Sequence, residues 1–206
     1  MNQILFTGKK NPSKKYLIKF KIQFYISLLL ILCSIFYFLY FSYNVYKKEK
    51  LSKMLLSKFN IERIYSNNDY TTVTLNENSN FFVIGIIEIP KINIQYPILS
   101  HTNDELLKIS PCRFYGPFPN EIGNLCIAAH NYDDNRFFSN LHKLSVGDSI
   151  NIYDLNSQKL IYYVYDKFEI MQSDTSCTNQ NTNGKKEITL VTCNNINKNR
   201  LVIKAK

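Results

Sequence analysis

The strongest hydrophobic pattern in the chain is one uninterrupted apolar stretch near the N-terminus. Residues 22–46 contain no charged side chain. As a helix, a stretch of this length would measure about 37 Å, and the hydrocarbon core of a bilayer is about 30 Å thick. Tyr25 at one end, and Tyr40, Tyr43 and Tyr46 at the other, are typical of membrane interfaces. The pattern predicts a transmembrane helix.

A cleavable signal peptide is the alternative interpretation of this stretch. Its apolar region would be shorter, and a cleavage site with small residues should follow it. No such site follows, so we favour an uncleaved signal anchor. Six lysines and no acid precede the stretch, whereas five lysines and Glu49 follow it. Because positive flanks stay on the cytoplasmic side, we expect a cytoplasmic tail over residues 1–21 and an extracellular C-terminal part.

A weaker helical pattern continues beyond the apolar stretch. Apolar residues recur at roughly helical spacing between residues 47 and 65, at Leu51, Met54, Leu55, Phe59 and Ile61. Residues 66–80 are rich in Asn, Thr and Ser, which is typical of a linker. We interpret residues 47–80 as a helical stalk and linker.

Residues 81–206 have a different pattern, in which short apolar or alternating runs are separated by polar turns. A short helix capped by Thr102 or Asn103 is predicted over 103–108, and a helical turn within 135–144. Residues 110–123 and 172–186 have the composition of loops. Strands are predicted at 82–89, 92–96, 124–129, 149–155, 160–171, 187–193 and 200–205. Seven or eight such strands predict an all-β barrel or sandwich.

The net charge of +9 first suggests a nucleic-acid partner. The charge is not spread along the chain, however. Residues 1–58 have a net charge of +10, and residues 59–206 have a net charge of −1. Because a nucleic-acid-binding surface should lie on the folded domain, we expect no nucleic-acid partner, and the basic residues are better explained by the membrane.

Three chemically active residues stand at the ends of predicted strands. The strand 187–193 directs Ile188, Leu190 and Thr192 to one face, and ends with Cys193 on the other. His130 follows the strand 124–129, and Arg200 begins the last strand. A cysteine thiolate is a nucleophile, an imidazole can transfer protons, and a guanidinium can stabilise an oxyanion. Together they would suit acyl transfer.

The remaining candidates have simpler interpretations. His101 and His142 are predicted to be surface residues, and Asp133 and Asp134 to form a solvated turn. Cys112 and Cys177 lie in predicted loops, where a disulfide between them would be compatible with an extracellular domain, although sequence does not give connectivity. The sequence has no CxxC or HExxH motif, so we expect no metal or other cofactor.

Several motifs, in order, resemble those of one enzyme family. Residues 189–193 (TLVTC) resemble the TLxTC signature of the sortases, the cysteine transpeptidases of Gram-positive cell surfaces. The resemblance extends over residues 81–206. It includes 85–92 (GIIEIPKI), 123–131 (GNLCIAAHN), 138–144 (FSNLHKL) with Gly147 and Asp148, and 200–202 (RLV).

The resemblance implies an eight-stranded sortase-type β-barrel with short helices, preceded by the transmembrane helix, with a catalytic domain at 81–206. Cys193 would attack the Thr–Gly carbonyl of an LPxTG-like sorting signal, and His130 would protonate the leaving amine. An amine of a peptidoglycan precursor or a pilin would resolve the thioester. Arg200 would hold the oxyanion or the peptide, with Thr192 and Asn131 as substrate contacts. The loop 172–186 lies where sortases recognise the signal. The partners would be surface proteins that bear the signal.

Departures from the family pattern bear on subclass. Asn131 after the histidine is similar to class B and some class D sortases, Ala129 replaces a common glycine, and six residues separate Cys193 from Arg200. The short spacing and the lack of a lid motif disfavour a pilin polymerase. L,D-transpeptidases keep His and Cys close together, and papain-like proteases place Cys first, so both fit less well. The non-enzymatic alternative is an inactive, membrane-anchored binding domain on a sortase-like fold.

Overall fold

The computed structural model describes residues 14–65, 72–74, 80–156, 158–194 and 198–206. The chain divides into two compact units, Met1–Lys47 and Lys48–Lys206. The helix α1 (Lys14–Tyr65) contributes to both units. It is long and apolar enough to cross a membrane, and its large apolar side chains between Ile18 and Tyr46 are exposed, as lipid contact requires. The predicted helix over 47–65 is the C-terminal part of α1.

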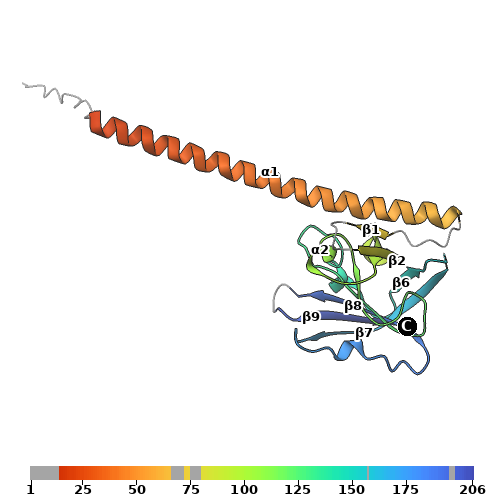
Figure 1. The fold of residues 1–206 in the computed structure, drawn as a ribbon. Helices are drawn as coiled ribbons and strands as arrows, with labels where there is room; N and C mark the ends of the chain where they lie inside the picture. Colours follow the sequence, from red (N-terminus) through yellow and green to blue (C-terminus); the bar gives the residue numbers. More distant parts are fainter. Residues whose placement is uncertain (1–13, 66–71, 75–79, 157, 195–197) are drawn as a thin grey trace, which may run out of the picture. The chain divides into compact units, whose positions relative to one another are not determined.

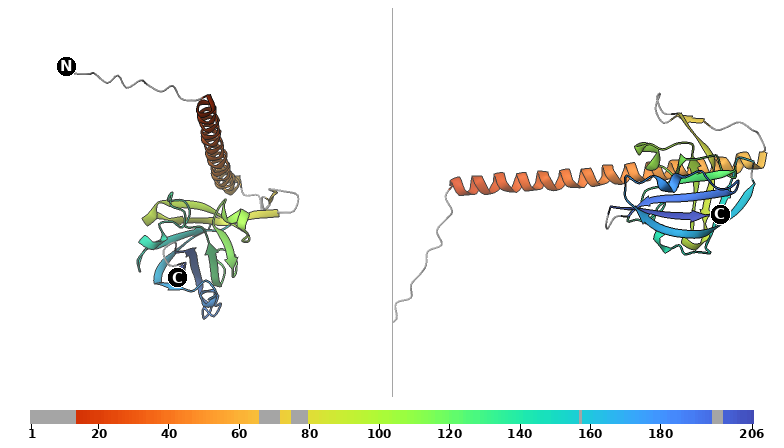
Figure 2. Two further views of the ribbon diagram at one scale, coloured as in Figure 1. Left: turned by 90° about the vertical axis from the view of Figure 1, so that its left-hand side faces the viewer. Right: turned by 90° about the horizontal axis from the view of Figure 1, so that it is seen from below.

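The second unit contains a closed β-barrel of eight strands (Figures 1 and 2). The strands are paired in the order β2-β3-β4-β5-β8-β9-β7-β6, and β6 pairs with β2 to close the barrel. Their bounds are β2 (Asn80–Ile89), β3 (Ile94–Leu99), β4 (Cys112–Tyr115), β5 (Gly123–Ala128), β6 (Ser149–Tyr153), β7 (Lys159–Ile170), β8 (Lys186–Cys193) and β9 (Arg200–Ala205). The eight-stranded barrel expected from the resemblance is confirmed.

The short strand β1 (Thr72–Thr74) pairs with β2 and stands outside the closed barrel. It lies in the segment 66–80 that was predicted to be a linker, most of which is outside the described residues. The boundaries predicted at residues 21, 46 and 80 therefore stay predictions.

Four short helical segments connect the strands. They are η1 (Pro90–Ile92), α2 (Asp104–Leu107), η2 (Leu141–Lys143) and η3 (Ser176–Thr178). The Asn103 side chain caps α2, because its Oδ1 accepts hydrogen bonds from the backbone N–H groups of Glu105 and Leu106 at 3.0 and 2.8 Å. Of the two caps considered, Asn103 is the one that the structure uses.

The prediction of a continuous loop over residues 110–123 was wrong, because β4 lies within it. The strand has only four residues and is flanked by Pro111, Gly116 and Pro117, so its sequence has the composition of a turn. Its pairing partners decide its conformation. Cys112 lies opposite Leu99 of β3 and Ala128 of β5. Tertiary contacts therefore outweigh the local composition.

Strand β2 is buried on both of its faces. Ile84, Ile87 and Ile89 belong to the large cluster inside the barrel. Phe81 and Val83 belong to a second cluster outside it, together with residues of α1 and α2. A strand that is covered on both faces needs apolar residues at consecutive positions, which explains the nearly continuous apolar run from residue 81 to 89.

The C-terminal part of α1 contacts this outer cluster and the neighbouring helix α2. The Leu55 side chain is 2% exposed and packs in the cluster, where Leu106 of α2 also lies. The Lys48 ammonium pairs with the Glu105 carboxylate at 3.1 Å. Because this ion pair is solvent-exposed, it should stabilise the contact much less than burial of Leu55 does. The residues around Leu55 are thus part of the folded unit that contains the barrel.

Replacing Leu55 with alanine should destabilise this unit. We expect Leu55→Ala to lower its free energy of unfolding by about 2–5 kcal/mol, the usual cost of emptying a buried leucine site. Met54, which is 51% exposed, provides the matched control, and Met54→Ala should change the free energy by less than about 0.5 kcal/mol. Urea unfolding of the full chain in detergent, followed by the near-ultraviolet circular dichroism of its tyrosines, measures both. Equal midpoints for the two variants would contradict the assignment of Leu55 to the folded core.

Candidate active site

Cys193 and Arg200 lie opposite each other at one end of the barrel. They are the last residue of β8 and the first residue of β9, and they are direct partners in the antiparallel register. Partners of this kind have Cβ atoms about 4.5–5.5 Å apart on the same face of the sheet. Cys193 is exposed and Arg200 is half-buried. The two side chains therefore leave the sheet next to each other on the same face, and a ligand can reach the thiol.

Backbone hydrogen bonds join the two described ends of the connection between these strands. The backbone N–H of Asn194 donates to the Asn199 carbonyl at 2.7 Å, and the N–H of Lys198 donates to the Asn194 carbonyl at 3.0 Å. The Asn194 side chain also donates to the Glu169 carboxylate on β7. These bonds fix the two ends of the connection, and thereby the relative positions of Cys193 and Arg200.

His130 reaches this end of the barrel because β5 runs parallel to β8. The last pair in the register is Ala128 with Val191, so the same register, two residues further on, brings His130 level with Cys193. Two side-chain bonds continue the pairing past the end of β5. The Thr192 hydroxyl donates to the Ala129 carbonyl at 2.8 Å, and the Asn131 amide donates to the Cys193 carbonyl at 2.8 Å. The structure thus gathers the three predicted residues at one rim.

The two predicted substrate contacts, Thr192 and Asn131, both have partners within the protein. Thr192 is 4% exposed, and its hydroxyl is engaged with the Ala129 carbonyl. The Asn131 side chain is hydrogen-bonded to the backbone of Cys193. In this structure both side chains hold the histidine segment against the cysteine strand. Contact of either residue with a substrate stays a prediction.

The surroundings of His130 disfavour its charged form. The ring is half-buried, and its centroid lies 5.0 Å from that of Tyr132. Burial lowers the pKa of His130 below its ordinary value, and the positive charges of Lys108 and Arg136 lower it further, while Asp104 opposes them. An ordinary histidine titrates near pH ~6.5. At neutral pH the His130 ring is therefore mostly neutral, and it can accept a proton.

The other cysteines of the barrel differ from Cys193 in their exposure. Cys112, Cys126 and Cys177 are buried, and Cys193 is exposed. Burial raises the pKa values of Cys112 and Cys126 to about 12, and it also raises that of Cys177. Because the thiolate is the reactive form, Cys193 is the thiol of the barrel that is available for chemistry.

The predicted positions of Cys112 and Cys177 need one correction. Cys112 lies in β4 and not in a loop, because the outer cluster buries it against Leu99 and Leu106. Cys177 lies in η3, as part of a different cluster with Val191 and Val202. All five cysteines of the chain are free in this structure, so it contains no disulfide between these two.

The loop between β7 and β8 covers the sheet face on which Cys193 and Arg200 lie. Val191 and Val202 occupy this face two residues before Cys193 and two after Arg200, and the Cys177 side chain packs on them. The Asn124 side chain holds the loop, because its Nδ2 donates to the carbonyls of Cys177 and Asn179 at 2.9 and 3.1 Å. The loop thus borders the thiol.

The other histidines have local partners. A His101 ring nitrogen lies 3.1 Å from the Ser100 hydroxyl, and a His142 ring nitrogen lies 3.0 Å from the Ser139 carbonyl. Asp134 accepts a hydrogen bond from the Arg136 guanidinium at 2.7 Å and is largely exposed. Among the residues that the structure describes, no three His, Cys, Asp or Glu side chains are grouped as metal ligands would be.

Sequence reasoning did not select Tyr132, Arg136 or Lys108, although all three act on His130. Tyr132 is its ring neighbour, and the two cations influence its pKa. Tyr132 and Arg136 stand two and six residues after the histidine in a turn-like segment, where no helical or strand periodicity predicts contact. Lys108 is 22 residues earlier, at the end of α2. The only local signal is the aromatic residue two positions after the histidine.

Comparison with known proteins gives a consistent result. The family model described as a sortase domain matches residues 87–206. Sortase A of Bacillus anthracis is 30% identical over 125 residues, which cover 57% of this chain and 55% of that protein. The chain therefore spans little more than half the length of this curated relative.

Solved structures extend the comparison to the fold. A Clostridium perfringens sortase D5 transpeptidase is 31% identical with a TM-score of 0.61, covering 78% of this chain and 98% of that one. Streptococcus agalactiae sortase C1 is 28% identical with a TM-score of 0.53, covering 60% and 66%. The family model alone accounts for more than half of the chain and for nearly all of the barrel. This protein therefore belongs to the sortase family.

Proposed function

We propose that the chain is a membrane-anchored cysteine transpeptidase that cleaves an LPxTG-like sorting signal and joins the acyl fragment to an amine. The observation that carries the proposal is the meeting of an exposed thiol, a guanidinium and an imidazole at one barrel rim. Cys193 and Arg200 are cross-strand partners, and the segment of His130 is bonded to the cysteine strand. Membership of a family of cysteine transpeptidases supports the same chemistry.

The first half of the reaction would form a thioester. The Cys193 sulfur, after its proton passes to His130, attacks the carbonyl carbon of the Thr–Gly bond. The negative charge that develops on the carbonyl oxygen would be stabilised by Arg200, which stays protonated throughout. As the C–N bond breaks, the imidazolium of His130 gives its proton to the leaving glycine amine. The neutral resting state of His130 suits the acceptance of the first proton.

The second half would transfer the acyl group to an amine. The incoming amine, from a peptidoglycan precursor or a pilin lysine, attacks the thioester carbonyl and loses a proton to His130. The C–S bond then breaks, and the sulfur of Cys193 leaves as a thiolate that regains the proton. No oxidant, reductant or metal is needed. The partners of the protein would accordingly be surface proteins with a sorting signal and a cell-wall or pilin amine.

The apolar helix supports a location at the cell membrane. The α1 segment from Ile18 can cross a bilayer, and the lysines before it favour a cytoplasmic N-terminus with the barrel outside. Similarity to a sortase D5 over 78% of this chain supports the class D interpretation of Asn131 over the class B one. The alternative function, an inactive binding domain, is disfavoured because Cys193 is exposed beside two suitable partners.

Peptide cleavage by the full chain in detergent tests the proposal. Quenched fluorescent peptides with LPxTG-, NPxT- and SPxT-type signals would be supplied with and without an amine acceptor. We expect cleavage of at least one peptide and a ligated product when the amine is present. His130→Ala should reduce kcat/KM by about 10²–10⁴-fold, the usual contribution of a general acid–base, and Cys193→Ala should abolish the reaction.

The outcomes of this assay separate the two functions. A folded chain that binds a signal peptide but cleaves none of the panel would favour the binding-domain alternative. Cleavage that persists in Cys193→Ala would exclude the proposed nucleophile altogether.

Arg200→Lys tests the role of the guanidinium. Lysine keeps the charge but lacks the planar fork of arginine, so a geometric role in holding the oxyanion predicts a loss of about 10²–10³-fold in kcat. Lys204→Arg is the control. It exchanges one cationic side chain for another on the same strand, at a residue that pairs with Thr189 and lies away from the rim. If Arg200→Lys retained the wild-type kcat, a directional contact with the oxyanion would be ruled out.

Thiol labelling offers a test that needs no substrate. In a Cys33→Ser chain kept folded at neutral pH, iodoacetamide should modify Cys193 alone, because burial protects the other three cysteines and raises their pKa values. Mass spectrometry of tryptic peptides would locate the label, and urea-unfolded protein would provide the fully labelled control. If Cys112, Cys126 or Cys177 were modified as fast as Cys193, the conclusion that Cys193 is the accessible thiol of the barrel would be contradicted.

A further inference from the structure

We propose that Tyr132 is a positioning residue for His130, and that Arg136 holds Tyr132 in place, so that a row of three contacting side chains fixes the imidazole at the rim. This inference rests on the proposed function, in which His130 carries protons. It concerns residues that do not touch the reacting atoms. We call the three side chains, Arg136, Tyr132 and His130, the histidine column.

The first contact of the column is between two rings. The centroids of His130 and Tyr132 are 5.0 Å apart, and their planes are inclined by 43°. This separation lies within the range in which aromatic rings attract one another. The Tyr132 ring is also 5.8 Å from the ring of Phe137, which is 2% exposed. One side of Tyr132 is therefore fixed to the core, and its position limits where the imidazole can lie.

The second contact is between a cation and a ring. The Arg136 guanidinium carbon lies 4.5 Å from the centroid of Tyr132 and 5.6 Å from that of Phe137. Its Nε donates to the Asp134 carboxylate at 2.7 Å, and the Arg136 side chain is only 15% exposed. A guanidinium over a ring face is attractive, and more so when water is partly excluded. Arg136, whose own position is fixed by Asp134, therefore restricts the position of the Tyr132 ring.

The backbone of this segment is folded back on itself, which brings the column together. Asn131 and Phe137 form an isolated β-bridge, and the N–H of Phe138 donates to the His130 carbonyl at 3.2 Å. Phe137 has a φ of 53°, which is uncommon for a bulky side chain. Backbone conformations of this kind persist when the surroundings impose them, and they are concentrated at functional sites. The burial of Phe137 against Tyr96, with ring centroids 5.1 Å apart, provides such surroundings.

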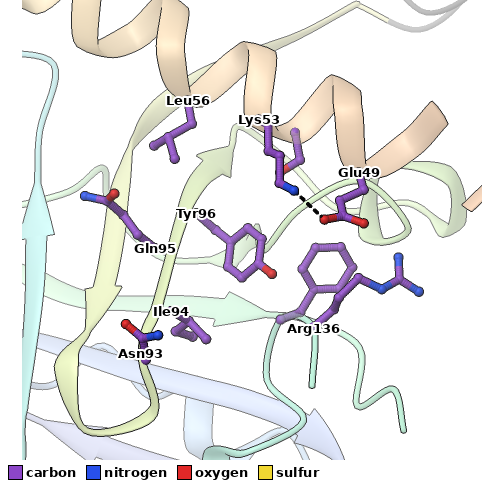
Figure 3. A pocket seen from close by; sticks show the side chains of 10 residues that line it. Glu49, Lys53, Leu56, Asn93, Ile94, Gln95, Tyr96 and Arg136 are labelled. Carbon is purple, nitrogen blue, oxygen red and sulfur yellow. Dashed lines mark ion pairs between the residues drawn. The ribbon is translucent and has the colours of Figure 1, made fainter. Parts of the chain in front are cut away.

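A cavity of about 210 Å³ lies beside Arg136 (Figure 3). Arg136 and Phe137 line it, together with Tyr96 of β3 and residues of α1 that include Glu49 and Lys53, which form an ion pair at 2.7 Å. Arg136 thus has free space beside it. A shorter side chain at this position can be accommodated without forcing the neighbouring groups to move, which makes Arg136 suitable for substitution.

The charges that face His130 give the column a measurable signature. Lys108 and Asp104 act from α2, and Arg136 acts from the same loop, while burial has the largest effect on the pKa of His130. Loss of the Tyr132 ring would let water reach the imidazole, so the pKa should rise toward the ordinary ~6.5. Removal of the Arg136 charge should shift it in the same direction. A residue that only stabilised the fold would leave this titration unchanged.

The test compares four variants of the full chain in detergent with the wild type. Tyr132→Leu removes the aromatic ring, and Tyr132→Phe keeps it. Arg136→Gln removes the guanidinium that contacts the Tyr132 ring. Tyr163→Leu, at a tyrosine that is 55% exposed, is the matched control. The chain has three histidines, so NMR of the ring protons can follow His130 once His101→Gln and His142→Gln have assigned the other two signals.

We expect Tyr132→Leu to lower kcat by roughly 10- to 100-fold with little change in KM, since displacement of a catalytic group by about 1 Å can cost this much. The titration midpoint of His130 should move to higher pH in Tyr132→Leu and in Arg136→Gln. The acidic limb of the pH–rate profile should move to higher pH in the same two variants, because the neutral imidazole is the form that accepts the first proton. Tyr132→Phe should restore most of the activity, and Tyr163→Leu should behave as the wild type.

Failure of the inference and failure of the proposed function give different results. If His130→Ala lowers kcat/KM as expected while Tyr132→Leu keeps the wild-type kcat and titration, the histidine column is refuted and the proposed function stands. If His130→Ala cleaves normally, the proposed function fails. Should Tyr132→Leu not fold, Arg136→Gln decides through its activity. The column predicts a lower kcat in that variant and a wild-type kcat would refute it, whereas loss of the positive charge alone already shifts the His130 titration.

Discussion

Parallel pairing of β5 with β8 holds the candidate active site together. The two strands bring His130 and Cys193 to the same end of the barrel, although 63 positions separate them in the chain. The last backbone bond of this pairing runs from the Ala129 N–H to the Val191 carbonyl at 3.2 Å, and the side chains of Thr192 and Asn131 then add two more bonds beyond it. Arg200 joins through the antiparallel pairing of β8 with β9. One strand, β8, therefore positions both partners of its own terminal cysteine.

Much of this arrangement could be predicted from the sequence, because its signals are local. The strand predicted over residues 200–205 is β9, and the strand over 187–193 is β8 without its first residue. Both contain β-branched residues, and a polar segment separates them in the sequence. The barrel with its eight strands follows from the family resemblance and is confirmed. The predicted roles of His130, Cys193 and Arg200 remain predictions, but their convergence at one rim is what those roles require.

Other features depend on contacts that no local pattern reveals. Strand β4 is short and lies among prolines, so only its neighbours β3 and β5 make it a strand. Tyr132 contacts both His130 and Arg136 because the chain reverses at Phe137, where φ is positive. The depressed pKa of His130 likewise depends on Lys108, from a different element. Such groups become visible only when the fold is known.

The two-sided burial of β2 has a consequence for how the protein can be shortened. Val83 and Ile86 face away from the barrel interior and are covered in part by Leu55 of α1. A chain that begins after α1 would leave this apolar surface in water, where it could pair with the same surface on a second molecule. Dimers or aggregates of such a shortened protein would then reflect the missing helix segment. A chain that begins near Lys48 would instead keep Leu55 over this surface.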